Sequence, residues 1–369
     1  MTTSINLVEL AVAGVQRLVP YQPGKPISEV QRELGLTRVS KLASNENPLG
    51  PGSKVLAAIT QAAQNITRYP DGSGFALKAA LASQCQLAPE QITLGNGSNE
   101  LLELVARTFL QPGLAALFSQ HAFAVYPLVT QAAGADAIVV PATDYSHDLD
   151  AMRAAITDAT RVVFIANPNN PTGTWLEAKA LENFISSLPA SVICVLDEAY
   201  HEYQPETRRP HSSAWLAKYP NLLITRTFSK AYGLAGLRIG YSLSSPELAE
   251  LLNRVRQPFN INSLALAAAE AALADDAHLQ RSLQINRDGM WQLEQGFTEL
   301  GLSWLPSAAN FISVRVGDNA GVIYQQLLAK GVIVRPVANY QMPEFLRVSI
   351  GTAEENRHFL SALTALLKA

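Results

Sequence analysis

Val192-Ile-Cys-Val-Leu-Asp197-Glu-Ala-Tyr200 contains an apolar run, predicted as a strand over 192–196, that is followed directly by the carboxylates of Asp197 and Glu198. A continuous apolar run of this length is typical of a strand buried on both faces, as in parallel sheets. In open α/β sheets, ligands bind beyond the carboxyl ends of the strands, and Asp197 lies at such an end. A buried carboxylate at this position could pair with a protonated heterocyclic nitrogen, or it could cap the turn that follows.

Similar runs flank this segment on both sides, and helical patterns separate them. The other predicted strands are 91–94, 114–118, 137–141, 161–166, 222–227 and 238–243. Helices are expected over 99–110, 148–156 and 177–187, where apolar residues recur on one face. The βαβα order predicts an α/β fold with a mainly parallel seven-stranded sheet and helices on both sides.

A different pattern follows residue 245. A helical region over 246–273 is broken near residues 258–260, and a strand, a helix and two further strands are expected at 310–316, 322–329, 332–337 and 345–350. A last helix begins near Glu354. We therefore expect three parts: an N-terminal arm with part of a small domain (1–46), a large domain (47–263) and a small α+β C-terminal domain (264–369).

Composition excludes several classes of protein. The chain has 369 residues, a net charge of −3 and 48% hydrophobic residues, so it predicts neither disorder nor binding to nucleic acid or an anionic membrane. Charged residues make up only 16% of the chain, against about 25% in average soluble proteins. Either a large interface between subunits or simple richness in alanine and leucine would account for this low fraction.

The cysteine count and the N-terminus both favour the cytoplasm. Two cysteines, Cys85 and Cys194, are too few for a disulfide framework, and no spacing typical of a zinc site occurs, so we expect no metal. No basic stretch precedes the first apolar residues, and no run approaches the length of a transmembrane helix.

Lys230 is the first candidate for a catalytic group. It lies in Arg226-Thr-Phe-Ser-Lys230-Ala-Tyr-Gly-Leu-Ala-Gly-Leu-Arg238, after a predicted strand and among small and hydroxyl residues. A lysine in a partly desolvated, cationic site loses its proton readily and can act as a nucleophile. The same lysine could equally be a surface residue of a loop.

Two further loops follow predicted strands. Asn167-Pro-Asn-Asn170-Pro-Thr-Gly173 is a rigid turn that could aim the Asn170 amide at a ligand, although such turns also occur in ordinary loops. Gly95-Asn-Gly97-Ser98 opens a helix, and its backbone N–H groups could bind a phosphate. It lacks the third glycine of a dinucleotide fingerprint, so alone it could be a tight connection.

In this order, together with Tyr69-Pro and Leu237-Arg238, these motifs resemble the fold-type I pyridoxal-phosphate aminotransferases. Within them the chain resembles the histidinol-phosphate aminotransferases, through Tyr21-Gln-Pro-Gly-Lys-Pro, the block 41–51 and Val332-Ile-Val-Arg335-Pro. The resemblance runs from about Pro20 to the C-terminus. It implies pyridoxal 5′-phosphate as cofactor.

The resemblance also assigns roles to individual residues. Lys230 would bond to the cofactor aldehyde and then move a proton, Asp197 would pair with the ring nitrogen, and Tyr200 and Asn170 would hydrogen-bond the phenolic oxygen. Phe123 would stack on the ring, although on its own it could be a core residue. The phosphate would meet Gly97, Ser98, Thr227, Ser229 and Arg238. Tyr69 would reach the phosphate of a neighbouring subunit, which implies a homodimer with shared sites.

Tyr21, Asn47, Arg335 and Arg347 are assigned to the substrates by the same resemblance. The implied reaction converts L-histidinol phosphate and 2-oxoglutarate into imidazole acetol phosphate and glutamate, in histidine biosynthesis. The two arginines could instead form salt bridges within the small domain. An aromatic amino acid aminotransferase and a phosphothreonine decarboxylase of the same family are alternatives, and a non-enzymatic regulator is a third.

Overall fold

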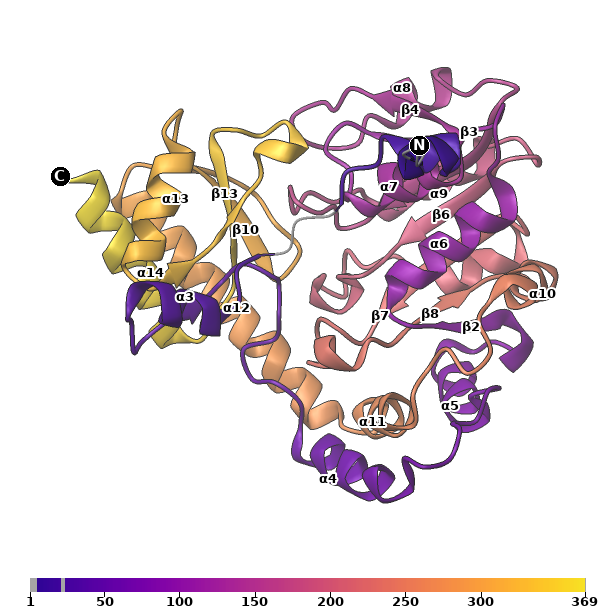
Figure 1. Ribbon diagram of the computed structural model, residues 1–369, viewed down its shortest axis with the longest axis horizontal. Coiled ribbons are helices and arrows are strands. Elements are labelled where there is room, and N and C mark those ends of the chain that lie inside the picture. The colour runs from indigo at the N-terminus through magenta and orange to yellow at the C-terminus, as the bar shows by residue number, and fades with distance from the viewer. Residues whose placement is uncertain (1–4, 21–23, 369) are drawn as a thin grey trace.

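A seven-stranded sheet forms the centre of the larger of two bodies in the computed structural model, which describes residues 5–20 and 24–368 (Figure 1). Its strand order is β2-β8-β7-β6-β5-β3-β4. Every pairing in it is parallel except those of β8, which is antiparallel to both β2 and β7. The expected mainly parallel sheet is confirmed. Its strands are β2 (Ile92–Gly95), β3 (Ala115–Ser119), β4 (Asp136–Val140), β5 (Thr160–Ala166), β6 (Ile193–Asp197), β7 (Leu222–Thr227) and β8 (Gly240–Leu243).

Alternate residues of these strands enter two separate hydrophobic cores. On β5, Val163 and Ile165 belong to one core, while Val162 and Phe164 belong to the other. The first core is covered mainly by α5 (Phe75–Cys85), α9 (Ala178–Ser187) and α11 (Ser263–Leu273), and the second by α6 (Ser98–Phe109), α7 (Val125–Ala132) and α10 (Pro246–Val255). Burial on both faces explains why these strands are continuous apolar runs.

The smaller body is built on a four-stranded antiparallel sheet of order β12-β13-β10-β9. Its core includes Phe297, Val348 and Phe359, which are fully buried. The 24-residue helix α12 runs from the bottom of this body toward α11 (Figure 1). The elements are β9 (Ser303–Leu305), β10 (Phe311–Arg315), β12 (Arg335–Pro336), β13 (Phe345–Ser349), α12 (Asp276–Glu299), α13 (Ala320–Ala329) and α14 (Ala353–Leu367).

The prediction of a single strand over 332–337 is wrong. Two short strands replace it: β11 (Val332–Ile333) pairs in parallel with β1 (Ser40–Lys41), and β12 pairs with β13. The residue between them, Val334, is also buried, so the apolar pattern continues through the point where the chain passes from one sheet to the other. Through β1, the start of the chain joins the smaller body.

The remaining α-helices are α1 (Leu7–Leu10), α2 (Ala13–Gln16), α3 (Ile27–Leu34), α4 (Ser53–Ala62) and α8 (Leu149–Ala154). Of these, α4 and α8 contribute Val55 and Met152 to the first core of the large sheet. Figure 1 shows α3 against the smaller body and α4 beside α11. Within residues 5–20 and 24–368, no helix has both the length and the apolar character needed to cross a membrane.

Candidate active site

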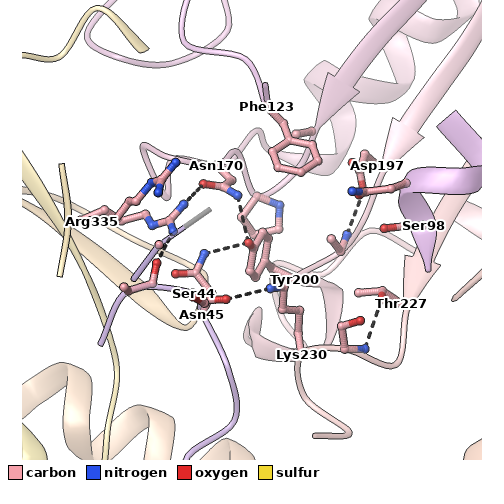
Figure 2. Close-up of a pocket in the computed structure, with 18 of the residues that line it drawn as sticks. Ser44, Asn45, Ser98, Phe123, Asn170, Asp197, Tyr200, Thr227, Lys230 and Arg335 are labelled. Carbon is pink, nitrogen blue, oxygen red and sulfur yellow. Dashed lines mark hydrogen bonds between the residues drawn. The ribbon is translucent and has the colours of Figure 1, made fainter. Parts of the chain in front are cut away.

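A cavity of about 200 Å³ lies beyond the carboxyl ends of β5, β6 and β7, between the seven-stranded sheet and the smaller sheet. Figure 2 shows the residues around it. Segments that are far apart in the sequence contribute to its wall. Its lining includes Gly24, Ala43, Ser44, Asn45, Ser98, Asn99, Phe123, Asn170, Asp197, Tyr200, Thr227, Ser229, Lys230, Arg238, Arg335, Tyr340 and Arg347.

Lys230 enters this cavity from the loop after β7. Its Nζ donates a hydrogen bond to the carbonyl oxygen of Ser44 over 3.2 Å and lies 5.8 Å from the centre of the Tyr200 ring. Burial, with help from the positive charge of Arg347, lowers the pKa of Lys230 to about 8. About a tenth of this amine is therefore uncharged at pH 7, far more than for an ordinary lysine, and can act as a nucleophile.

Asp197 ends β6 and is only 4% exposed. Its carboxylate accepts hydrogen bonds from the Tyr126 hydroxyl (2.9 Å), the Thr225 hydroxyl (3.1 Å) and the backbone N–H of Ala199 (3.2 Å). Burial nevertheless raises its pKa. A cationic ring nitrogen placed against this carboxylate would favour its ionised form. The Phe123 ring lies on the same cavity and packs edge-on against Tyr126.

Tyr200 is held by two amides. Asn45 Nδ2 and Asn170 Nδ2 both donate to the Tyr200 hydroxyl oxygen, over 2.9 and 3.1 Å. Asn170 Oδ1 in turn accepts a hydrogen bond from Arg347 over 2.6 Å. Burial raises the pKa of Tyr200 to about 12, so the phenol keeps its proton near neutral pH and can donate it.

An anion-binding cradle lies at the start of α6. Ser98 begins this 12-residue helix, and Thr227, Ser229 and Arg238 line the same part of the cavity. The Arg238 guanidinium donates to the Ser229 hydroxyl over 3.3 Å. Helix N–H groups, hydroxyls and a guanidinium together form a donor set that suits a phosphate dianion.

Gly97 supports this cradle from behind instead of lining it. Its φ is +76°, and a Cβ at this position would collide with the Arg238 guanidinium. Only glycine therefore allows the arginine to approach the start of α6 this closely.

Residues 37–363 match the model of the family described as "Aminotransferase class I and II". This range includes every described residue of the cavity except Gly24. The chain belongs to this aminotransferase family. It is 62% identical over 364 residues to histidinol-phosphate aminotransferase 2 of Pseudomonas fluorescens, with 98% of each chain covered. It is 55% identical to histidinol-phosphate aminotransferase 1 of Idiomarina loihiensis, again with 98% of each covered.

Solved structures that resemble this aminotransferase include a protein with the same name as its sequence relatives. The histidinol-phosphate aminotransferase of Sinorhizobium meliloti, in complex with pyridoxal-5′-phosphate, superposes with a TM-score of 0.90 at 31% identity, covering 97% of each chain. An aspartate aminotransferase of Thermus thermophilus with maleate gives a TM-score of 0.82 at 22% identity, covering 97% of this chain and 99% of that one. The second likeness concerns the fold alone.

Most of the residues that the sequence predicted for the site of this aminotransferase are brought together, but Asn47 is not. Its side-chain amide donates to the carbonyl oxygen of Ala231 and to the hydroxyl of Ser282, both over 2.9 Å, and its Oδ1 accepts from the Leu49 N–H. The resemblance assigns Asn47 to a substrate; in the structure its polar atoms bond within the protein, and Asn45, two residues earlier, lines the cavity.

One predicted site residue, Tyr69, lies outside the cavity of its own chain. Tyr69 is 83% exposed, stacks on Phe259 with 4.8 Å between ring centres, and does not line the cavity of its own chain. That position leaves Tyr69 available to another subunit. Tyr21 falls outside the described residues.

Sequence reasoning missed several groups of the site. Asn45, Ser44 and Tyr340 line the cavity, and Tyr126 supports Asp197 from the core. The block 41–51 was informative, but the choice between its two asparagines depends on backbone geometry, because Asn45 has a positive φ of 55°. Tyr126 had a weaker signal: it is a tyrosine inside an apolar helix, and a buried tyrosine hydroxyl requires a partner.

Proposed function

We propose that this aminotransferase transfers the amino group of L-histidinol phosphate to 2-oxoglutarate, as a step of histidine biosynthesis, with pyridoxal 5′-phosphate as cofactor. Arg335 and Arg347 carry the proposal. They occupy opposed positions on β12 and β13, both line the cavity, and they suit a substrate phosphate in one half-reaction and the carboxylates of 2-oxoglutarate in the other. The names of the relatives at 55–62% identity support the same reaction.

The donor set of the cavity fits the cofactor at both ends. The cradle at Ser98 and Arg238 suits its phosphate, and the buried Asp197 carboxylate suits a protonated ring nitrogen. When bound, pyridoxal phosphate supplies an electron-withdrawing ring that stabilises negative charge at the substrate α-carbon. The side chains of the protein bind this ring, orient it and move protons beside it.

Lys230 would act twice. Its uncharged amine would first bond to the cofactor aldehyde, whose oxygen leaves as water. After a substrate amine has displaced it, the freed amine would take a proton from the substrate α-carbon and give it to the cofactor C4′ carbon. A pKa of about 8 suits both acts, because the amine can gain or lose a proton near neutral pH.

The other side chains would hold the ring in place. Asp197 would keep the ring nitrogen protonated, and Tyr200 with Asn170 would hold the phenolic oxygen as an anion. Phe123 would cover one face of the ring. Tyr21, in the N-terminal arm, would contact the substrate phosphate together with the two arginines.

We also propose a homodimer with shared active sites. The exposed rings of Tyr69, Phe75 and Phe259 support it, because exposed aromatic side chains of this size are typical of an interface. A second copy that covers them would let Tyr69 reach the neighbouring cradle. The low charged fraction of 16% fits such an interface.

The domain division 1–46, 47–263 and 264–369 remains a proposal. Since α11 packs in the core of the large sheet, moving the second boundary to the start of α12 fits the packing better. We propose the cytoplasm as the compartment, where the free Cys85 and Cys194 would stay reduced.

A donor panel tests the proposed reaction. Protein loaded with pyridoxal phosphate is mixed with histidinol phosphate, phenylalanine, tyrosine or glutamate, and the loss of the visible absorbance of the bound cofactor is followed in a single turnover. We expect histidinol phosphate to give the highest kcat/KM among the donors other than glutamate. A higher value for phenylalanine would overturn the substrate and leave the aminotransferase chemistry standing.

A further inference from the structure

Three consecutive residues, Ala43, Ser44 and Asn45, each contact a different functional group of the cavity. The carbonyl oxygen of Ala43 accepts from Arg347 over 2.7 Å, and that of Ser44 accepts from Lys230 over 3.2 Å. The side chain of Asn45 donates to Tyr200 over 2.9 Å. We refer to residues 43–45 as the 43–45 segment; Figure 2 shows Ser44 and Asn45 beside Tyr200 and Lys230.

Hydrogen bonds hold both the backbone and the side chain of Asn45 in place. It is 1% exposed, its backbone N–H donates to the Ser349 hydroxyl over 2.7 Å, and its carbonyl oxygen accepts from Asn310 over 2.9 Å. The Ser349 hydroxyl donates back to Asn45 Oδ1 over 3.0 Å. Because Oδ1 is already occupied, the Nδ2 donor of Asn45 is the group turned toward Tyr200.

The same reasoning fixes the second amide. Arg347 can only donate hydrogen bonds, so its contact to Asn170 identifies the atom it meets as Oδ1 and turns Asn170 Nδ2 toward Tyr200. Two N–H donors thus meet a single phenol oxygen. Both amides present N–H groups to this oxygen, and an amide NH2 group cannot accept a hydrogen bond, so the Tyr200 proton points toward neither of them.

We propose that Asn45 is a positioning residue for Tyr200. Together with Asn170 it donates to the Tyr200 oxygen and so directs the phenol proton away from both amides and into the cavity, toward the phenolic oxygen of the cofactor. The inference rests on the proposed function, because that oxygen belongs to pyridoxal phosphate. It adds a residue of the N-terminal part of the chain, held by the smaller body through Ser349, to the control of the cofactor's charge.

The pH titration of the visible chromophore of the loaded protein tests the proposal. Asn45→Gly removes the amide and tolerates the positive φ of 55°. A phenolic oxygen that loses its donor holds the proton it shares with the Lys230 nitrogen more strongly. We therefore expect the apparent pKa of the chromophore to rise by about one pH unit, as expected for the loss of one hydrogen bond to a charged oxygen.

A double-mutant cycle with Tyr200→Phe separates positioning from a general effect on folding. If Asn45 acts through Tyr200, the chromophore pKa of the double variant equals that of Tyr200→Phe alone. A shift that persists undiminished in the Tyr200→Phe background would overturn the proposal, and so would an unchanged pKa in Asn45→Gly.

Asn356→Ala is the matched control. It removes another fully buried asparagine, whose amide bonds Gly351 and Gln292 in the smaller body and does not line the cavity, and it should leave the chromophore pKa unchanged. If Asn45→Gly does not fold, Asn45→Asp keeps the shape and turns the donor into an acceptor, so the same rise is expected and its absence counts against the proposal. A wild-type protein that retains no visible chromophore after gel filtration would refute the proposed cofactor, whereas a titrating wild type with an unmoved Asn45→Gly refutes only this inference.

Discussion

Arg335 and Arg347 lie directly opposite each other on the neighbouring antiparallel strands β12 and β13. Directly opposed side chains on adjacent strands lie on the same face of the sheet, and like charges at such positions destabilise it. Both arginines line the cavity. Two guanidinium groups on one wall of the cavity can donate several charge-assisted hydrogen bonds to one anion, such as the phosphate or carboxylate of a substrate.

Replacing Arg335 with Gln should affect donors according to their charge. We expect kcat/KM for histidinol phosphate to fall by about 100-fold, the value of a charge-assisted contact of about 2–3 kcal/mol, and kcat/KM for phenylalanine to fall much less. Arg315→Gln is the control, since Arg315 pairs with Glu344 and does not line the cavity. An equal fall in kcat/KM for both donors would show that Arg335 does not bind the phosphate of the substrate.

The pKa of Lys230 predicts a pH dependence for cofactor capture. Because that pKa is lowered to about 8, the uncharged amine rises about tenfold for each pH unit below 8 and levels off above it. The rate at which apoprotein captures pyridoxal phosphate, followed by absorbance in a stopped-flow instrument, should follow this curve. Lys230→Ala should abolish the part of the absorbance that survives gel filtration. A rate that is flat between pH 6 and 8 would contradict the lowered pKa.

Tyr126→Phe tests the support of Asp197. It removes a 2.9 Å hydrogen bond that lowers the pKa of this buried carboxyl, so the carboxylate becomes less stable. We expect cofactor affinity to weaken on the order of tenfold, equivalent to about 1.5 kcal/mol. Equilibrium titration of apoprotein with pyridoxal phosphate measures the change. Tyr219→Phe, at a partly buried tyrosine that bonds Glu182 away from the cavity, should leave the affinity as it is.

The buried ion pair between Glu198 and Arg226 is expected to stabilise the folded protein. Arg226 donates to the fully buried Glu198 over 2.8 and 2.9 Å. Burial alone would raise the pKa of Glu198, but the charges of His201 and Arg226 outweigh it and lower that pKa to about 2. Glu198→Gln leaves a buried guanidinium without its counter-charge and should lower the free energy of unfolding by about 3–5 kcal/mol.

The sign of the pH effect follows from the lowered pKa of Glu198. The stabilisation is complete above the unfolded pKa of 4.5 and is lost as the pH falls from there toward 2. Urea unfolding of wild type and Glu198→Gln across this range measures the difference. Glu344→Gln, which breaks the solvent-screened pair with Arg315, should lower the free energy of unfolding much less. A similar loss from both variants would show that burial of the pair has no special weight.

Mixed dimers test the shared active site. Chains carrying Tyr69→Phe are combined with chains carrying Lys230→Ala, and the heterodimers are isolated. If Tyr69 serves the neighbouring subunit, one site in each heterodimer has both its lysine and its tyrosine, and about half of the wild-type activity per dimer should remain. Heterodimers no more active than the parent homodimers would refute sharing.

Much of the large sheet was predictable because its strands are buried on both faces. The observed limits of β6 and β7 differ from the expected ones by at most one residue, since an apolar run has sharp ends. Strand direction was harder to predict. Nothing in the residues of β8 shows that it is antiparallel to both neighbours, because direction depends on the path of the connecting chain.

The site was predictable where chemistry selects a residue type, and less so where geometry does. Lys230, Asp197 and Arg238 lie together in the cavity because each closes a strand or loop at the same edge of the sheet. Asn45 and Asn47 are the same residue type two positions apart. The left-handed backbone at Asn45 decides which of them faces the cavity, and this conformation cannot be predicted from the sequence of one chain.

The pairing of β1 with β11 has a consequence for the newly made chain. Ser40 and Lys41 leave the ribosome early, yet their partners Val332 and Ile333 are made near the end of translation. Asn45 likewise bonds Ser349, which is made 304 residues later. The nascent polypeptide can therefore complete the large sheet long before it can complete the cofactor pocket. Stable capture of pyridoxal phosphate is expected only after β13 has emerged, so premature termination before Ser349 should leave a folded core that cannot retain the cofactor.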